Sequence, residues 1–185
     1  MALYLTEIST GTDERGRVAA LIEQLGSAAS TAGGRVVEVQ VSQDLARIFF
    51  VAEDVEPARL TAAITDLGTS QSEPAPVRLV GATLDEVRAR SGDTASHLVE
   101  WDFPAGLDME TYLGRKKEKA PLYAQVPEVT FLRTYVREDM GKCLCLYDAP
   151  DDAAVVRARE AVSTPIDRLH RLATPSDAPA ASPQP

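Results

Sequence analysis

Hydrophobic positions in the first half of the chain follow two different periods. Val18, Leu21 and Leu25 lie three and four residues apart, which predicts a helix from Asp13 to about Thr31. Alternating valines instead predict a strand at Arg35–Val41. The other predicted elements of this half are strands at Ala2–Ile8, Ala46–Ala52 and Pro76–Val80 and a helix that begins at Pro57 and ends before Gly68. The predicted order is strand, helix, strand, strand, helix, strand.

The same order of elements returns in the second half of the chain. Its clearest part is a hairpin, in which the strand-like runs Val129–Arg137 and Lys142–Tyr147 are joined by a polar turn. Around this hairpin the pattern predicts strands at His97–Phe103 and Ile166–Leu172 and helices at Asp108–Ala120 and Asp151–Val162. Aligned without gaps, residues 41–56 match residues 136–151 in most apolar positions. The sequence therefore predicts a duplication of one unit.

A split β-α-β unit that occurs twice predicts an α+β fold with two ferredoxin-like sheets in tandem. Each sheet is expected to be antiparallel, in strand order 4-1-3-2, with both helices on one face. The strands carry apolar residues on both faces, so we expect the two sheets to pack as an internal pseudo-dimer, as in a dimeric α/β-barrel. A homodimer of the whole chain is the competing solution. The predicted boundaries are 1–82 for the first unit, 83–95 for a linker helix, 96–173 for the second unit and 174–185 for a disordered tail rich in Pro, Ala and Ser.

Composition and charge narrow the class of protein. The 185 residues include 28 acidic and 19 basic side chains, a net charge of -9, which argues against a nucleic-acid partner. No apolar run is long enough to cross a membrane and no signal peptide is recognisable, so we expect a cytoplasmic protein. Cys143 and Cys145 lie on one strand face and are expected to be free thiols. No phosphate loop, dinucleotide fingerprint or hydrolase motif is present.

Three stretches carry a resemblance to a known family: His97–Pro104, Val129–Pro150 and Pro165–Leu169. The second half resembles a family first described as a domain of unknown function, whose characterised type is a small nickel-binding protein with a ferredoxin-like fold. The resemblance implies a divalent metal such as nickel as the cofactor. Most histidines that hold nickel in that type are missing here, because His97 and His170 are the two histidines of the chain.

The predicted strand order brings one group of polar residues together. The first strand of the second unit would lie between the third and fourth strands, which places Glu100 beside Cys145 and beside the segment from Arg168 to His170. A carboxylate, a thiol and an imidazole in that place can hold a metal or act as an acid and base pair. The alternative is a structural salt bridge from Glu100 to Arg168 or to Arg133. The predicted metal ligands are Glu100, Asp102, Cys145 and His170.

Two further groups are candidates for ligand binding. Arg133 and Tyr135 are expected to share a strand face with Phe131 and to line a pocket, unless they only cover the sheet with their polar tips in water. The basic run at residues 115–119 is either a solvated helix end or an anion-binding patch. The predicted ligand-binding residues are Glu100, Asp102, Arg133, Tyr135 and Arg168.

These observations favour a non-catalytic protein that binds a small molecule or a metal ion. The alternative is a cofactor-free oxygenase, cyclase or isomerase of the dimeric α/β-barrel type, which requires an enclosed cavity of roughly 300 Å³ or more beside Arg133 or Tyr135. A third possibility is a subunit that assembles with itself or with another chain through an open sheet face.

Overall fold

The computed structural model describes residues 2–89 and 95–173 of the chain, and these form two compact units. The first unit contains residues 2–76, 84–89 and 172–173, and the second contains residues 77–83 and 95–171. The tail predicted for residues 174–185 lies outside the described residues. Within the described ranges, no helix combines the length and the apolar character that crossing a lipid bilayer requires.

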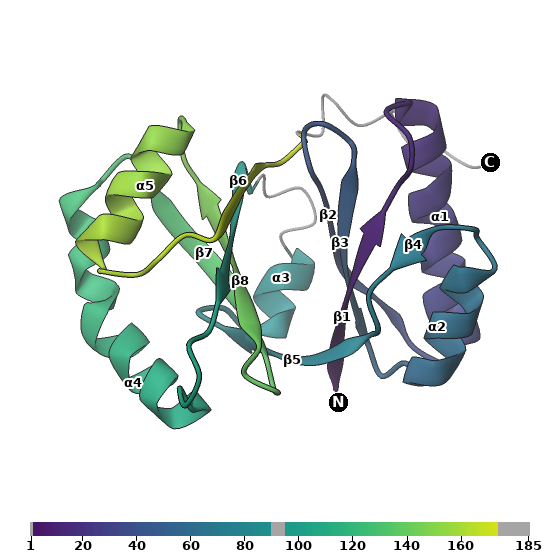
Figure 1. Ribbon diagram of the computed structural model, residues 1–185, viewed down its shortest axis with the longest axis horizontal. Helices are drawn as coiled ribbons and strands as arrows, with labels where there is room; N and C mark the ends of the chain where they lie inside the picture. The colour runs from purple at the N-terminus through teal and green to yellow at the C-terminus, as the bar shows by residue number, and fades with distance from the viewer. Residues whose placement is uncertain (1, 90–94, 174–185) are drawn as a thin grey trace. The chain divides into compact units, whose positions relative to one another are not determined.

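The first unit is a sheet with two helices on one of its faces (Figure 1). β1 pairs antiparallel with β3 and with β4, and β3 pairs antiparallel with β2, so that the first three predicted strands have the expected order. The elements are β1 (Leu3–Ser9), α1 (Arg15–Thr31), β2 (Arg35–Val41), β3 (Arg47–Glu53), α2 (Pro57–Thr65), β4 (Ser70–Gln71) and α3 (Leu84–Ala89). Leu25, Leu60 and Phe50 meet in the core between the helices and the sheet.

The predicted fourth strand of the first unit is divided between the two units, after Pro76. The predicted strand at 76–80 exists as β5 (Ala75–Val80), but its residues Val77–Val80 pair with β7 (Thr130–Arg137) of the second unit. β5 also follows β1 directly in the sheet order, as predicted for the fourth strand, and the two-residue β4 pairs with β1 as well.

The second unit repeats the arrangement. Its strands pair antiparallel in the order β5-β7-β8-β6-β9, which is the predicted order 4-1-3-2 with β5 added at one edge. The further elements are β6 (His97–Asp102), α4 (Met109–Lys119), the 3-10 helix η1 (Ala120–Gln125), β8 (Lys142–Asp148), α5 (Asp152–Ala161) and β9 (Arg168–Arg171). Helices α4 and α5 lie on one face of this sheet (Figure 1). The predicted fold class, two ferredoxin-like α+β units in tandem, is confirmed.

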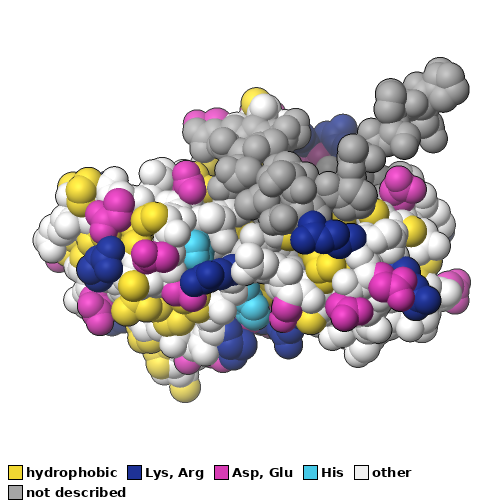
Figure 2. Space-filling model, turned by 90° about the horizontal axis from the view of Figure 1, so that it is seen from above, with side chains coloured by type: hydrophobic (Ala, Val, Ile, Leu, Met, Phe, Trp, Pro, Cys, Tyr) yellow, Lys and Arg dark blue, Asp and Glu magenta, His cyan; other side chains and the backbone are white. Residues whose placement is uncertain are grey.

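Side-chain carboxylates fix where these helices begin. Asp108 accepts a hydrogen bond from the backbone N–H of Thr111 at 2.7 Å, and Asp151 accepts one from that of Ala154 at 2.8 Å. Each carboxylate satisfies a backbone donor that has no partner within the helix. On the face drawn in Figure 2, acidic and basic side chains are interspersed.

A β-bulge in β7 changes which residues share a face. The pairing with β8 shifts between Phe131 and Arg133, so that Leu132 is the extra residue. Phe131 therefore points to the helix side, where its ring stacks on Tyr123 with 5.5 Å between the centroids. Arg133 and Tyr135 lie on the opposite face. The expectation that these two residues share a face with Phe131 was wrong, because a strict alternation of side chains does not include a bulge.

Candidate functional site

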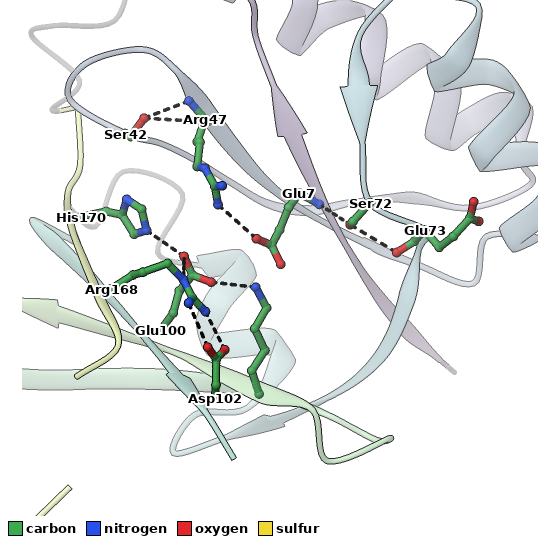
Figure 3. Close-up of polar contacts among 10 residues, drawn as sticks. Glu7, Ser42, Arg47, Ser72, Glu73, Glu100, Asp102, Arg168 and His170 are labelled. Atoms are coloured by element: carbon green, nitrogen blue, oxygen red, sulfur yellow. Dashed lines mark hydrogen bonds and ion pairs between the residues drawn. The ribbon is translucent and has the colours of Figure 1, made fainter. Parts of the chain in front are cut away.

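Glu100 is the centre of a network of charges on the sheet face away from α4 and α5. Its carboxylate is fully buried and accepts hydrogen bonds from Lys142 Nζ at 2.6 Å and from His170 Nε2 at 2.8 Å (Figure 3). Arg168 Nε lies 3.1 Å from the same carboxylate. Burial alone would raise the pKa of Glu100, but the hydrogen bonds from His170 and Lys142 and the nearby cationic charges bring it to about 2. Glu100 is therefore ionised and surrounded by basic groups.

Arg168 connects Glu100 to Asp102. The guanidinium contacts both carboxylate oxygens of Asp102, at 2.9 Å and 2.5 Å, as Figure 3 shows. This bidentate pair lowers the pKa of Asp102. The structure thus brings Glu100, Asp102, Arg168 and His170 together. The sequence left open a metal or acid-base site and a structural salt bridge, and the structure contains the salt bridge from Glu100 to Arg168.

Cys145 lies on the other face of the sheet. In the pairing of β6 with β8, Glu100 is opposite Leu144 while Val99 is opposite Cys145, and neighbouring side chains point to opposite faces. The four predicted metal ligands therefore do not converge. Within residues 2–89 and 95–173, no three side chains of His, Cys, Asp or Glu are grouped so that they could hold a metal ion.

Arg133 and Tyr135 are more deeply buried than either sequence interpretation expects. Arg133 is 4% exposed and Tyr135 is 2% exposed, so their polar tips are not in water. Both lie on the face of Glu100, since Tyr135 is paired with the same Leu144.

A cavity of about 130 Å³ lies on the helix side of the second unit, at β6, α4, η1 and α5. We call it the helix-side cavity, and Arg133 and Tyr135 are not among its lining residues. Of its twelve described lining residues four are basic and none is acidic. They are Trp101, Leu107, Tyr112, Arg115, Lys116, Lys119, Ala120, Tyr123, Arg159, Val162, Ser163 and Thr164. Three of these, Arg115, Lys116 and Lys119, belong to the basic run that the sequence offered as an anion-binding patch.

Arg159 projects from the buried side of α5 into this region and is only 3% exposed. Its Nη1 lies 3.3 Å from the Tyr147 hydroxyl and 3.6 Å from Cys145 Sγ, and its Nη2 donates to the carbonyl oxygen of Pro165. Its Nε has no hydrogen-bond partner in the described part of the chain. Sequence reasoning did not identify Arg159, although an arginine on the apolar stripe of the predicted helix 151–162 was the available signal.

Lys116 reaches the same region from α4. Its Nζ donates to Thr134 Oγ1 at 3.1 Å and lies 4.0 Å from the centroid of the Phe131 ring. Thr134 Oγ1 donates in turn to Cys145 Sγ at 3.2 Å. Burial lowers the pKa of Lys116, and the positive charge of Arg159 acts in the same direction.

The two cysteines are free and buried, as the sequence predicted. Their sulfur atoms are 3.8 Å apart. Burial raises the pKa of Cys143, whereas the hydrogen bond from Cys143 and the charges of Lys116 and Arg159 lower the pKa of Cys145. Cys145 is therefore the sulfur of the pair whose surroundings favour a negative charge, and it lies beside the guanidinium of the buried arginine.

Aromatic rings also line the cavity. Trp101 and Tyr112 lie 6.2 Å apart between centroids, and the Tyr123 hydroxyl is 3.0 Å from that of Tyr147. The helix-side cavity thus combines flat apolar surfaces with cationic groups. Such a lining suits a small organic anion.

Comparison with solved structures shows the fold. A protein described as a candidate chlorite dismutase, TA0507, aligns over 93% of this chain and 95% of its own, with a TM-score of 0.54 and 17% sequence identity. A candidate monooxygenase from Fusobacterium nucleatum subsp. nucleatum ATCC 25586 aligns over 92% of this chain and 89% of its own, with a TM-score of 0.40 and 12% identity. None of the curated proteins matches the chain.

The second half also matches a family by its sequence. The resemblance that was drawn from its strands and from the run around residues 143–150 is confirmed by this match. Residues 97–172 match the family described as "Nickel responsive protein SCO4226-like".

Proposed function

We propose that this chain is a binding protein and that its ligand is a small organic anion held in the helix-side cavity of the second unit. The observation that carries the proposal is the charge of the lining: four basic side chains and no acidic one among the described residues. An anion would be attracted into such a cavity, and a cation would be repelled.

Arg159 is the residue most suited to contact the ligand. It is nearly completely buried, it lines the cavity, and its Nε lacks a partner among the described residues. A buried donor without an acceptor costs about 1–3 kcal/mol, so a carboxylate that accepts this hydrogen bond would recover that free energy. Arg115 and Lys119, at the same cavity, would add long-range attraction.

The size and the lining limit the ligand. A cavity of about 150 Å³ is sufficient for a benzene molecule, and this cavity measures about 130 Å³. Trp101, Tyr112 and Tyr123 offer ring surfaces to an apolar or planar part of the ligand. We therefore infer a ligand of about this size with one carboxylate.

Trp101 makes the test direct, because it is the single tryptophan of the chain and lines the cavity. Tryptophan fluorescence is recorded while benzoate or pyruvate is added, with the neutral molecules benzamide and acetone as references. The anions are expected to change the emission with a Kd of about 1 mM or tighter, and the neutral molecules are expected to bind at least about tenfold more weakly.

The variant R159M removes the guanidinium but keeps a long side chain, and it should abolish the response to anions. R157M is the matched control, because Arg157 is on the same helix and pairs with Glu128 at 2.7 Å outside the cavity lining. If benzoate and pyruvate leave the Trp101 emission of the wild-type protein unchanged, the proposal is wrong. Equal affinity of R159M and R157M would also remove Arg159 from the site.

Nickel binding is the second candidate, and the family match supports it. The donor set found here does not fit it well. Glu100 and Asp102 already pair with basic groups, and Cys145 lies on the opposite sheet face. Nickel prefers nitrogen and sulfur donors in a tetragonal arrangement, whereas a single imidazole, that of His170, is at hand near Glu100. We therefore assign no step to nickel.

Metal analysis of protein purified without a histidine tag tests this candidate. Near-stoichiometric nickel would establish it, and trace amounts would remove it. H170A should lower the nickel content if His170 is a ligand, and H97A is the matched control because it removes the other histidine of the chain.

The other two sequence hypotheses have less support. A cofactor-free enzyme was expected to need roughly 300 Å³ beside Arg133 or Tyr135, and the helix-side cavity is smaller and has other lining residues. An assembly subunit was expected to show an open apolar face. The large apolar side chains that are exposed in the described ranges are Val36 and Val156, one in each unit.

A further inference from the structure

We propose that Lys116 captures small oxo acids as an imine, so that the helix-side cavity binds its ligand covalently and reversibly. The proposal rests on the proposed function, because the carboxylate of the oxo acid would bind to Arg159 and the other basic residues that line the cavity. The probe molecules are pyruvate and glyoxylate, which carry a carbonyl carbon next to a carboxylate.

The position of Lys116 is the first support. It is a lysine that lines a cavity while its amine is held by a hydroxyl group instead of a carboxylate. Thr134 has one hydroxyl proton and donates it to Cys145 Sγ, so Thr134 Oγ1 accepts from the amine. A neutral amine can donate one proton in this way and still present its lone pair. The Phe131 ring, 4.0 Å from Nζ, keeps one side of the amine away from water.

The surrounding charges are the second support. Arg159 Nη1 lies 3.6 Å from Cys145 Sγ, the sulfur that Thr134 connects to Lys116, so a second cationic group lies near the amine. Burial lowers the pKa of Lys116, and Arg159 lowers it further, while the two cysteines act in the opposite direction. A desolvated lysine beside a second cation is the arrangement that gives a nucleophilic amine near neutral pH.

The reaction is balanced without any further reagent. The lone pair of Nζ attacks the carbonyl carbon, and a C–N bond forms while the C=O π electrons move to oxygen. Loss of that oxygen as water, with the two protons that the nitrogen gives up, leaves a C=N bond. Nothing is oxidised or reduced, and water reverses the reaction when the free oxo acid is removed.

Neighbouring lysines provide an internal comparison. Lys117 is exposed and does not line the cavity. Lys119 lines it, but its Nζ lies 3.3 Å from the carbonyl oxygen of Ser163 and it is nearer to solvent at the end of α4. We therefore expect imine formation at Lys116 and not at the adjacent positions.

Reductive trapping tests the proposal on the full chain. The protein is incubated with pyruvate and cyanoborohydride, and the adduct is located by intact mass and peptide mapping. We expect one adduct per chain, at Lys116, in the wild-type protein and in the control K117R, and none in K116R. Acetone, which has the same carbonyl without the carboxylate, should label Lys116 at least about tenfold more slowly.

The outcomes separate the two proposals. If pyruvate changes the Trp101 fluorescence but no adduct forms at Lys116, the imine is overturned and the anion site remains. If neither occurs, both proposals fail. Equal labelling of Lys116 and Lys117 overturns the imine as well. Competition by benzoate is a measurement that does not depend on how K116R folds. Benzoate should slow pyruvate labelling of wild-type Lys116 at least about tenfold. If benzoate leaves the labelling unchanged, the reactive lysine lies outside the cavity.

Discussion

Arg159 Nη1 lies 3.6 Å from Cys145 Sγ in the interior of the second unit. Among the described residues the guanidinium contacts the Tyr147 hydroxyl, the Pro165 carbonyl oxygen and Cys145 Sγ, and its charge contributes to the lowered pKa of Cys145. Buried charges persist in proteins mainly when they are paired. A sulfur whose surroundings favour a negative charge is therefore the partner best suited to a buried arginine at the wall of the helix-side cavity.

Removal of the Cys145 sulfur should destabilise the protein more than removal of the Cys143 sulfur. C145A leaves Arg159 without its anionic partner and is expected to lower the free energy of unfolding by about 3 kcal/mol. C143A removes a sulfur that is equally buried, but leaves the ion pair, and should cost about 1 kcal/mol. Urea denaturation of both variants measures the difference. Equal losses would mean that Cys145 acts as a small apolar residue and not as a thiolate.

Glu100 should make the protein sensitive to acid. Its folded pKa of about 2 lies below the unfolded value of about 4.3. The stabilisation by the ionised form is therefore complete above the unfolded value and is lost as the pH falls toward 2. The difference corresponds to roughly 3 kcal/mol. Unfolding free energies at pH 6 and pH 2.5 should differ more for the wild-type protein than for E100Q, and parallel pH curves would show that Glu100 is not preferentially ionised in the folded state.

Asp102 and Glu100 share Arg168, yet they should contribute differently to stability. Asp102 is half exposed, and solvent screens its pair, so D102N should cost less than about 1 kcal/mol. E100Q leaves Lys142 and Arg168 facing a buried neutral group and should cost about 3 kcal/mol. Thermal unfolding of the two variants at neutral pH gives the comparison. A larger loss for D102N would place the centre of the network at Asp102.

The sequence predicted that Glu100 lies beside Arg168 and His170, because these neighbours depend on strand order, but it did not predict the contact with Lys142. Glu100 and His170 come together since β6 lies between β8 and β9, and that order follows from the repeated pattern of elements. The strand at 76–80 was predicted beside the first strand, and β5 has that place in the sheet order, but periodicity does not reveal that β5 also pairs with β7. The predicted sheet face of Phe131 was wrong because the hydrophobic pattern does not reveal a bulge.

The helix-side cavity could not be predicted from the sequence, because it depends on contacts between residues that are far apart along the chain. Arg159 occupies a position of α5 where the apolar stripe predicts a core residue, and its charge becomes meaningful only beside Cys145. That contact joins residues fourteen positions apart. The basic run at 115–119 was recognised, but whether it faced water or a cavity depended on the packing of α4 on the sheet.

Thr134 connects Lys116 to Cys145, and its replacement by valine should change the ionisation of the thiolate. T134V keeps the shape of the side chain but removes the donor to Cys145 Sγ and the acceptor for Lys116 Nζ. Because the hydrogen bond stabilises the thiolate, its loss should raise the pKa of Cys145. The thiolate absorbance in the ultraviolet, followed as a function of pH, should therefore titrate at a higher pH in T134V. T130V is the matched control, since Thr130 is exposed on the same strand, and it should titrate like the wild-type protein. Coinciding curves for T134V and T130V would show that the Thr134 hydroxyl does not affect the ionisation of Cys145.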